Sequence, residues 1–207
     1  MFFEREARAC GYRAIAGLDE AGRGPLAGPV VAAAVILPSR SLPIGINDSK
    51  RLTEGERERL YSDIVRTAVA FGVGLASEQE IDALNILQAT KVAMRRALEA
   101  LYPQPDYLLL DAMYLPGVLL PQRAVIKGDA LSLSIAAASI LAKVTRDRLM
   151  GVYHAQYPEY DFASHKGYPT PLHLARLAQY GPCPIHRRSF SPVRALSGFS
   201  HSDSVSS

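Results

Sequence analysis

The chain contains very few cysteines and no long hydrophobic run. Its only 2 cysteines, Cys10 and Cys183, stand far apart and form no CxxC pair. They argue against a disulfide scaffold and a structural zinc site, and they indicate the reduced thiols of a cytosolic protein. No apolar run approaches the roughly 20 residues that a membrane span needs, and residues 1–13 lack the apolar core of a signal peptide. The sequence therefore predicts a cytoplasmic protein with no membrane partner.

A strong charge of either sign is also absent. The 23 Lys and Arg residues against 20 Asp and Glu give a formal net charge of +3. This mild basic excess fits a nucleic-acid partner but does not indicate one by itself. The 207 residues suffice for one substantial core, or for one domain with an appendage.

Segments with the patterns of strands and helices alternate along the chain after an opening hairpin. We expect strands at 14–19, 28–37, 69–76, 107–110 and 123–126, and helices at 53–68, 77–83, 86–101, 131–150 and 171–179. This alternation predicts an α/β domain with a mixed sheet, antiparallel at first and then parallel.

Local signals add detail to this expectation. Thr53 and Ser77 have the pattern of helix N-caps, and Glu80 follows Ser77 at the spacing of a capping box. The helix expected at 131–150 is rich in Ala and Ser in its first half, which predicts close packing on the sheet. Residues 197–207 are rich in Ser and poor in apolar residues, so we expect a disordered tail there.

Two adjacent acids at the end of the first strand are the most informative feature of the sequence. Asp19 and Glu20 are followed at once by the turn Gly22-Arg23-Gly24. Neighbouring carboxylates repel each other, whereas a glycine turn lets backbone N–H groups approach a sugar-phosphate closely. Carboxylates beside such a turn imply a hard metal ion between them, because the acids alone would repel the phosphate. Since side chains alternate along a strand, both acids can face one ion only if the backbone bends at Glu20.

Two further acids stand where expected elements end or begin. Asp111 closes one strand, and Asp129 precedes the long helix. A two-metal site for phosphodiester chemistry needs three or four converging carboxylates, and Mg²⁺ and Mn²⁺ prefer oxygen ligands. Ordinary structural roles remain open: Asp129 could be a helix N-cap, Asp111 could begin a turn, and Glu20 could be a surface acid. Asp147, flanked by two arginines, has the pattern of a solvated helix charge.

Four motifs, in order along the chain, resemble the family of bacterial ribonuclease HII. Residues 17–31, GLDEAGRGPLAGPVV, resemble the signature of that family, and residues 47–52, NDSKRL, resemble its D-S-K-x-L segment. Lys127-Gly128-Asp129 with residues 136–147 resembles its block of an Asp followed by a helix, and residues 165–170, HKGYPT, resemble its C-terminal K-G-Y motif. The resemblance covers the chain from about residue 14 to residue 195.

The resemblance implies an RNase H-like fold: a mixed five-stranded sheet flanked by helices, with a small C-terminal helical region. It implies a catalytic domain at 1–165, a helical extension packed on it at 166–196, and the tail at 197–207. The implied activity is endonucleolytic cleavage of the RNA strand of RNA–DNA hybrids, and nicking of duplex DNA 5′ of a single embedded ribonucleotide. The products would be a 3′-hydroxyl and a 5′-phosphate, which suits ribonucleotide excision repair. The expected partners are these two nucleic acids, and we expect a monomer.

The resemblance also assigns roles to individual residues. Four acids match the catalytic, metal-binding carboxylates of the family, which would hold two Mn²⁺ or Mg²⁺ ions during catalysis: Asp19, Glu20, Asp111 and Asp129. One ion would activate a water and the other would stabilise the leaving 3′-oxygen, so that no histidine base is required.

Six residues are candidates for substrate binding. By the resemblance, Gly22, Arg23 and Gly24 would recognise the 2′-hydroxyl through backbone contacts, and Tyr168 would stack on the sugar of the next nucleotide. The 2′-hydroxyl is the group that distinguishes RNA from DNA locally. A tyrosine in a Gly-Tyr-Pro loop is otherwise commonly a packing residue. Lys50 and Lys166 could contact phosphates, although exposed lysines are usually only solvated.

Other classes of protein fit the sequence less well. The turn lacks the Gly-Lys-Ser/Thr of a P-loop and the spacing of G-x-G-x-x-G, so these nucleotide sites are a poor fit. A related nuclease or recombinase acting on DNA would have no use for a ribose-sensing turn. A non-catalytic nucleic-acid-binding module would be weakened by surplus carboxylates. A structural or protein-interaction domain gives no reason for the acid cluster.

Overall fold

The centre of the molecule is a five-stranded mixed sheet, seen in a computed structural model that describes residues 1–39, 45–46 and 52–197. The strands are β1 (Ile15–Ala21), β2 (Val30–Ile36), β3 (Ala70–Ala76), β4 (Tyr107–Asp111) and β5 (Gln122–Val125). They lie in the order β3-β2-β1-β4-β5. The pairs β1–β2 and β2–β3 are antiparallel, and β4 and β5 continue parallel to β1. The predicted mixed sheet, antiparallel first and then parallel, is confirmed.

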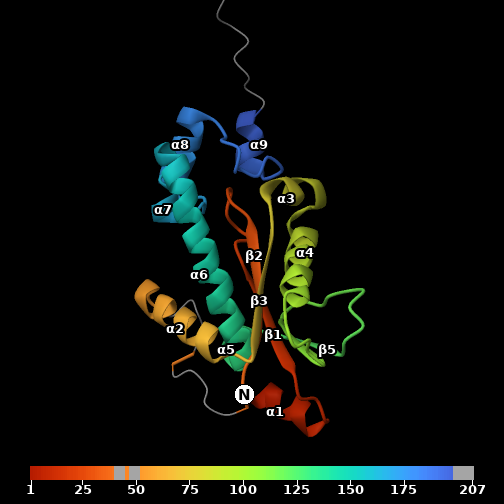
Figure 1. Cartoon of the computed structure of the whole chain (residues 1–207). Helices are drawn as coiled ribbons and strands as arrows, with labels where there is room; N and C mark the ends of the chain where they lie inside the picture. The colour runs from red at the N-terminus through yellow and green to blue at the C-terminus, as the bar shows by residue number, and fades with distance from the viewer. Residues whose placement is uncertain (40–44, 47–51, 198–207) are drawn as a thin grey trace, which may run out of the picture.

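Helices cover both faces of this sheet (Figure 1). On one face, α4 (Ile86–Glu99) packs on β2 and β3, with the short α3 (Glu78–Leu84) directly before it. On the other face, α6 (Leu133–Gln156) packs on β1 and β2, and α2 (Glu54–Thr67) lies beside α6. The sheet is thus buried between two helical layers, and β2 is apolar and buried along its whole length.

The two predicted helix caps are confirmed. Thr53 accepts the Glu56 N–H, and the Glu56 carboxylate accepts the Thr53 N–H at 2.7 Å. Ser77 and Glu80 form the same reciprocal pair, with 2.9 Å from the Ser77 nitrogen to Glu80 Oε2. Each box satisfies backbone donors that the first turn of a helix would leave unpaired, which fixes where α2 and α3 begin.

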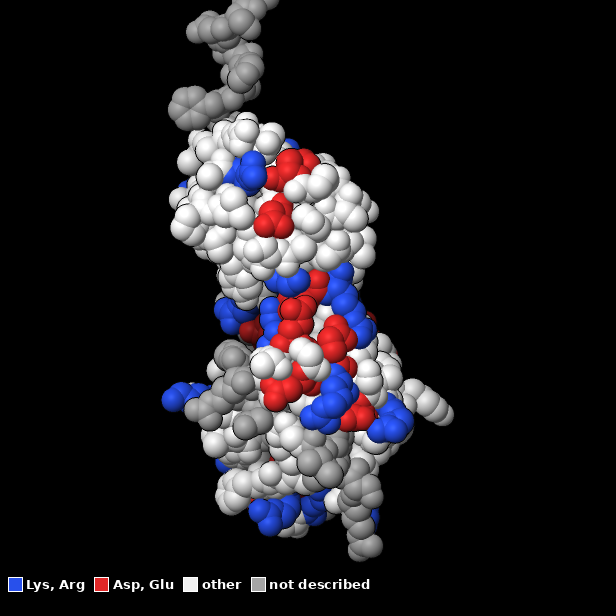
Figure 2. All heavy atoms as spheres, turned by 90° about the vertical axis from the view of Figure 1, so that its left-hand side faces the viewer, with Lys and Arg blue, Asp and Glu red and all other residues white. Residues whose placement is uncertain are grey.

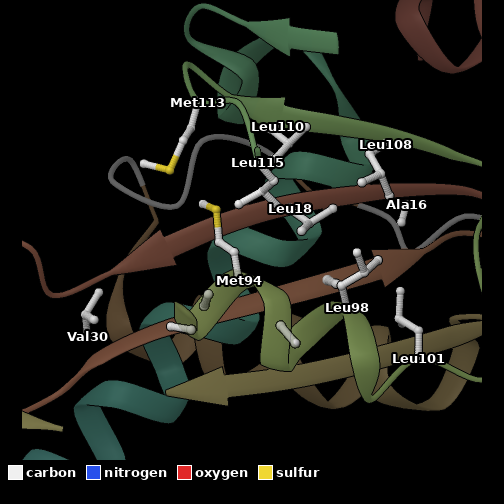
Figure 3. Close-up of a cluster of buried hydrophobic side chains, with 14 of the residues drawn as sticks. Ala16, Leu18, Val30, Met94, Leu98, Leu101, Leu108, Leu110, Met113 and Leu115 are labelled. Carbon is white, nitrogen blue, oxygen red and sulfur yellow. The ribbon is translucent and has the colours of Figure 1, made fainter. Parts of the chain in front are cut away.

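The larger core cluster lies between α4 and the sheet. Figure 3 shows Met94 and Leu98 of α4 pointing toward the strand residues Leu18, Leu108 and Leu110. All five side chains are buried. Truncating such a side chain to Ala typically lowers the free energy of unfolding by about 2–5 kcal/mol. Because the cluster includes residues of both β1 and β4, its packing helps to hold these two strands side by side.

Small residues let α6 approach the sheet closely, as its Ala and Ser content predicts. A Cβ added to Gly17 of β1 would lie only 2.1 Å from the backbone carbon of Ser134. Ala136, Ala137 and Ala138 of the same helix are buried against the sheet. The close contact fixes the position of α6 relative to the end of β1.

The helix predicted at 131–150 is present as α6, which runs on to Gln156, but its predicted start at Leu131 is wrong because the chain breaks at Ser132. A short α5 (Gly128–Leu131) ends there, and the Ser132 side chain caps α6, accepting the Ile135 N–H. Asp129 lies inside the first turn of α5, where Lys127 occupies the N-cap position, so the N-cap role considered for Asp129 is also wrong.

Several elements carry no clear signal in the sequence. They are α1 (Phe2–Ala9), the 3₁₀ turn η2 (Pro158–Tyr160), α7 (Phe162–His165) and α9 (Ser191–Ser197). In α1, the buried Glu4 accepts hydrogen bonds from the Ser132 hydroxyl and the Ser134 N–H, at 2.7 and 3.0 Å. This carboxylate thereby joins the N-terminal helix to the start of α6.

The chain after α7 forms a helical region at one end of the sheet (Figure 1). It contains α8 (Pro171–Tyr180) and α9, and an isolated bridge between His186 and Ala27 attaches it to the segment before β2. The predicted tail lies outside the described residues, apart from Ser197 at the end of α9. Within the described part of the chain, no helix combines the length and apolar character needed to cross a membrane.

Candidate active site

Two predicted acids lie together at the ends of adjacent strands. Leu18 of β1 pairs with Leu110 of β4, and the next residues along the two strands are Asp19 and Asp111. Because parallel strands end at the same edge of a sheet, the fold places these two carboxylates side by side. Both line one cavity of about 440 Å³, together with Glu20.

The two adjacent acids reach this cavity without the bend that the sequence led us to expect at Glu20. Strand β1 continues through Glu20 to Ala21, and the backbone turns only at Gly22, where φ is +96°. The Asp19 carboxylate accepts the Glu20 N–H at 2.8 Å, and Glu20 forms an ion pair with Arg23 at 3.3 Å. The pair therefore lies at an open strand end, where both side chains line the same space.

The electrostatics of the cavity favour a bound cation. Burial, and then the neighbouring charges of Glu20 and Asp111, raise the pKa of Asp19 well above its usual range. A hydrogen bond from Ser139 and the Glu20 N–H oppose this shift. Hard divalent ions prefer carboxylate oxygens, and a cation would offset the repulsion between these acids. The donor set therefore fits Mg²⁺ or Mn²⁺.

The fourth predicted acid lies next to the cavity but does not line it. Asp129 is buried in the first turn of α5, and the N–H of its neighbour Gly128 donates to Asp111 Oδ1 at 2.8 Å. In the described part of the chain, no three His, Cys, Asp or Glu side chains already form a ready ion site. The metal role of Asp129 stays a prediction.

Two glycines in and beside the turn are required by packing. A Cβ on Gly22 would lie 2.1 Å from Arg146 Nε, and a Cβ on Gly28 would lie 2.4 Å from Met150 Sδ. In contrast, a Cβ on Gly24 would meet nothing closer than the ring of Tyr168, at 3.7 Å. Gly22 and Gly28 therefore let the turn pack on α6, whereas Gly24 borders the cavity.

Tyr168 is held beside this turn. It lines the cavity and is half exposed, and the Leu26 N–H donates to the Gly167 carbonyl at 2.8 Å. Arg146 strengthens the junction because it donates to the carbonyls of Ala27 and Lys166, at 3.0 and 2.9 Å. The ring centroid of Tyr168 lies 6.0 Å from the Arg146 guanidinium carbon, so a packing role stays open, and its substrate-binding role stays a prediction.

The two predicted lysines have different outcomes. Lys166 does not line the cavity; its backbone N–H donates to the Phe162 carbonyl, and its carbonyl accepts from Arg146, each at 2.9 Å. Lys50 lies outside the described residues. A phosphate contact by either lysine stays a prediction.

Three polar lining residues were missed from the sequence: Arg57, Ser139 and Lys143. Ser139 and Lys143 lie within the motif at 136–147, and their spacing on one helix face could have revealed them. Lys143 pairs with Asp147 at 2.7 Å, and the Asp147 side chain is only 11% exposed. The solvated role expected for Asp147 is therefore wrong. Arg57 on α2 carried no comparable signal.

Charged side chains of both signs gather across the middle of the face formed by α2 and α6, below a largely uncharged surface (Figure 2). Ion pairs on these helices include Lys143–Asp147 and Arg148–Glu58. Because charges of both signs cancel, the mild net charge of the chain is compatible with a strongly charged band on this face.

Solved structures with the same fold define the class of protein. The ribonuclease H2 of Pyrococcus horikoshii OT3 matches with a TM-score of 0.75 and 32% identity, over 90% of this chain and 98% of that one. Bst-RNase HIII, solved in complex with Mn²⁺, has a TM-score of 0.67 at 17% identity, over 89% and 69% of the two chains. The mixed sheet flanked by helices is therefore the fold of type 2 ribonucleases H.

Sequence comparison then gives the family. The family model described as Ribonuclease HII matches residues 16–193. A Ribonuclease HII of Syntrophotalea carbinolica is 56% identical over 194 residues, which is 94% of this chain and 93% of that protein. The chain belongs to the ribonuclease HII family and is an endoribonuclease of the ribonuclease H type.

Proposed function

We propose that this enzyme hydrolyses the RNA strand of RNA–DNA hybrids and nicks duplex DNA on the 5′ side of a single ribonucleotide. The observation that carries the proposal is the meeting of two surfaces in one cavity. The cavity is lined both by Asp19, Glu20 and Asp111 and by the turn Gly22–Gly24 with Tyr168. An acidic site suited to divalent ions thus adjoins a backbone turn that can contact a sugar.

Divalent ions are the cofactors that this donor set suits. Asp19, Glu20 and Asp111 would hold the ions, and Asp129 would join them from α5. When bound, two Mg²⁺ or Mn²⁺ ions supply an activated water and stabilisation of the leaving 3′-oxygen, which gives a 3′-hydroxyl and a 5′-phosphate. The Ser139 hydroxyl, hydrogen-bonded to Asp19, would keep that carboxylate oriented.

The rest of the cavity would bind the nucleic acid. Backbone groups of Gly22, Arg23 and Gly24 would contact the 2′-hydroxyl, and the ring of Tyr168 would lie against the next sugar. Lys143 at the cavity wall would contact a phosphate, as would Lys50 and Lys166. We propose that the enzyme acts as a monomer in the cytoplasm. The free thiols of Cys10 and Cys183 agree with a reducing compartment.

A duplex carrying one ribonucleotide tests the proposal. We expect the wild-type enzyme, with Mg²⁺ or Mn²⁺, to nick the labelled strand 5′ of the ribonucleotide and to leave an all-DNA duplex intact. Asp111→Asn should lower the rate by orders of magnitude, because it removes a charged ligand. Near-wild-type cleavage by Asp111→Asn would contradict the metal role of this residue.

Chelation separates catalysis from binding. In excess chelator we expect cleavage to stop while the duplex still binds, because the turn and Tyr168 do not need the ions. Folded enzyme that binds the duplex but never cleaves it, with either ion, would favour a binding module over a nuclease.

A further inference from the structure

A buried arginine from the C-terminal region lies directly behind the glycine turn. Arg187 is completely buried. Its Nη2 donates to the Gly22 carbonyl at 2.6 Å and to the Gly28 carbonyl at 2.7 Å. Its Nη1 donates to the Arg23 carbonyl at 3.1 Å, and its Nε donates to Gly28 at 2.9 Å. One guanidinium therefore holds three carbonyls, those of Gly22 and Arg23 in the turn and that of Gly28 just before β2.

This arrangement is electrostatically costly. A second buried arginine, Arg146, lies close by, and burial, followed by the charge of Arg146, lowers the pKa of Arg187 to about 9. The buried Glu78 contributes an opposing negative charge. A buried charge of this kind is tolerated only with good hydrogen-bond geometry. The planar fork of arginine meets that need, because it can reach several carbonyls at once.

Peptide geometry shows what the clamp does to the other side of the turn. In a planar trans peptide, the C=O and the N–H point in opposite directions. Since the Gly22 and Arg23 carbonyls point inward to Arg187, the N–H groups of Arg23 and Gly24 point away from it. Both residues line the cavity, whereas the completely buried Arg187 does not. The guanidinium thus fixes the orientation of two donors at the place where a substrate sugar would lie.

We propose that Arg187 is a positioning residue that sets specificity for ribose, by aiming the N–H groups of Arg23 and Gly24 at the 2′-hydroxyl of the substrate. This inference rests on the proposed function of the cavity. The segment around residue 187 thereby contributes to substrate recognition, although it is remote in sequence from every candidate catalytic acid.

The adjacent arginine provides a matched control. Arg188 is exposed, and its backbone N–H donates to Asp82 at 2.9 Å. We would measure the dissociation constants of Arg187→Lys, Arg187→Met and Arg188→Met for a one-ribonucleotide duplex and for an all-DNA duplex, in chelator. The constant for the all-DNA duplex divided by that for the one-ribonucleotide duplex measures recognition of the ribose. A general loss of phosphate binding changes both constants alike and leaves this ratio unchanged.

The expected result is a loss of about tenfold in this ratio for both Arg187 variants, because neither side chain can hold three carbonyls. Arg188→Met should keep the wild-type ratio within about twofold. A wild-type ratio in Arg187→Lys would overturn the clamp, because it would show that a buried charge suffices. A wild-type enzyme with no preference for the ribonucleotide would instead refute the proposed function itself.

Hydrogen exchange gives a test that is independent of substrate. In folded Arg187→Lys we expect faster exchange of the amides at 22–28, with exchange in β2 unchanged. Unchanged exchange at 22–28 would overturn the inference. If the Arg187 variants do not fold, Phe190→Leu takes their place, because the Arg187 guanidinium lies 5.1 Å from the Phe190 ring centroid. That variant should show faster exchange at 22–28 and a ratio reduced by about threefold, and wild-type values for both would contradict the clamp.

Discussion

His173 and His186 are joined by a hydrogen bond of 3.0 Å between their Nε2 atoms, inside the C-terminal region. The neighbouring bonds fix the tautomers. The Cys183 N–H donates to His186 Nδ1, so His186 carries its proton on Nε2 and donates to His173. His173 then donates from Nδ1 to the carbonyl of Tyr168 at 2.9 Å. A chain of neutral histidines thus ends on the backbone of the cavity tyrosine.

This chain predicts a loss of stability in mild acid. Burial is the main cause that lowers the pKa of His173 to about 4 and that of His186 to about 3. An unfolded histidine has a pKa near 6.5, so the unfolded chain binds protons more strongly. The contribution of the pair to stability is complete above pH 6.5, and it falls as the pH drops from about 6.5 toward the folded pKa values of about 4 and about 3.

Urea unfolding at pH 7.5 and pH 5.0 measures this effect. We expect wild type to lose on the order of a few kcal/mol between the two pH values. His173→Gln should be less stable at pH 7.5 by about 1–3 kcal/mol, but should lose less on acidification. His154→Gln, outside the hydrogen-bond chain, should follow wild type. An equal acid loss in His173→Gln would contradict the role of the pair.

The two glycines of the turn should respond differently to alanine. Gly22→Ala would place a Cβ 2.1 Å from Arg146 Nε at a φ of +96°, so we expect a loss of about 2–4 kcal/mol in the free energy of unfolding. Gly24→Ala has only ordinary contact with Tyr168, so its stability should change by less than about 1 kcal/mol while cleavage falls. Similar stability losses in both variants would show that the turn is uniformly constrained.

Tyr168 should govern preference for an RNA-to-DNA junction. A tyrosine face fits against a deoxyribose but would crowd a 2′-hydroxyl there, so Tyr168→Ala should reduce the preference for the junction over an all-RNA hybrid. The ratio of kcat/KM on the two substrates measures this. Tyr102, which is 91% exposed and does not line the cavity, provides the control Tyr102→Ala. An unchanged ratio in Tyr168→Ala would refute the stacking role.

Lys143 should act on substrate binding. Lys143 lines the cavity, so Lys143→Met should raise KM by about three- to tenfold. It should also lower by about one the number of counterions released on binding, measured as the slope of affinity against salt. Arg148→Met is the control, because Arg148 lies five residues further along α6, pairs with Glu58 and does not line the cavity. If both variants changed KM alike, the effect would come from general surface charge.

Local patterns of the sequence were sufficient for much of the fold. The apolar run at 28–37 predicted β2 and the Thr53 and Ser77 signals predicted the starts of α2 and α3, because strand burial and capping depend on neighbouring residues. The break at Ser132 was missed because it depends on Glu4, 128 residues away, whose carboxylate binds the Ser132 hydroxyl. Helical periodicity alone cannot register such a contact.

Some residues of the candidate site could be predicted from the sequence, and others could not. Asp19, Glu20 and Asp111 could be chosen from the sequence because an acid at a strand end is a local pattern, and the fold brings all three to one cavity. Arg146 and Arg187 could not be chosen, because as isolated residues they resemble ordinary surface charges. Their role depends on carbonyls more than 100 residues away in the chain.

The sequence by itself thus determined the order of strands and helices, the acids at the strand ends and the glycine turn. Each of these follows from side-chain periodicity or backbone freedom within a few residues. Only the tertiary structure decided which way the turn faces and what supports it. That outcome depends on hydrogen bonds from Arg187 to the turn and from His173 to Tyr168, and such bonds form only after the chain has folded.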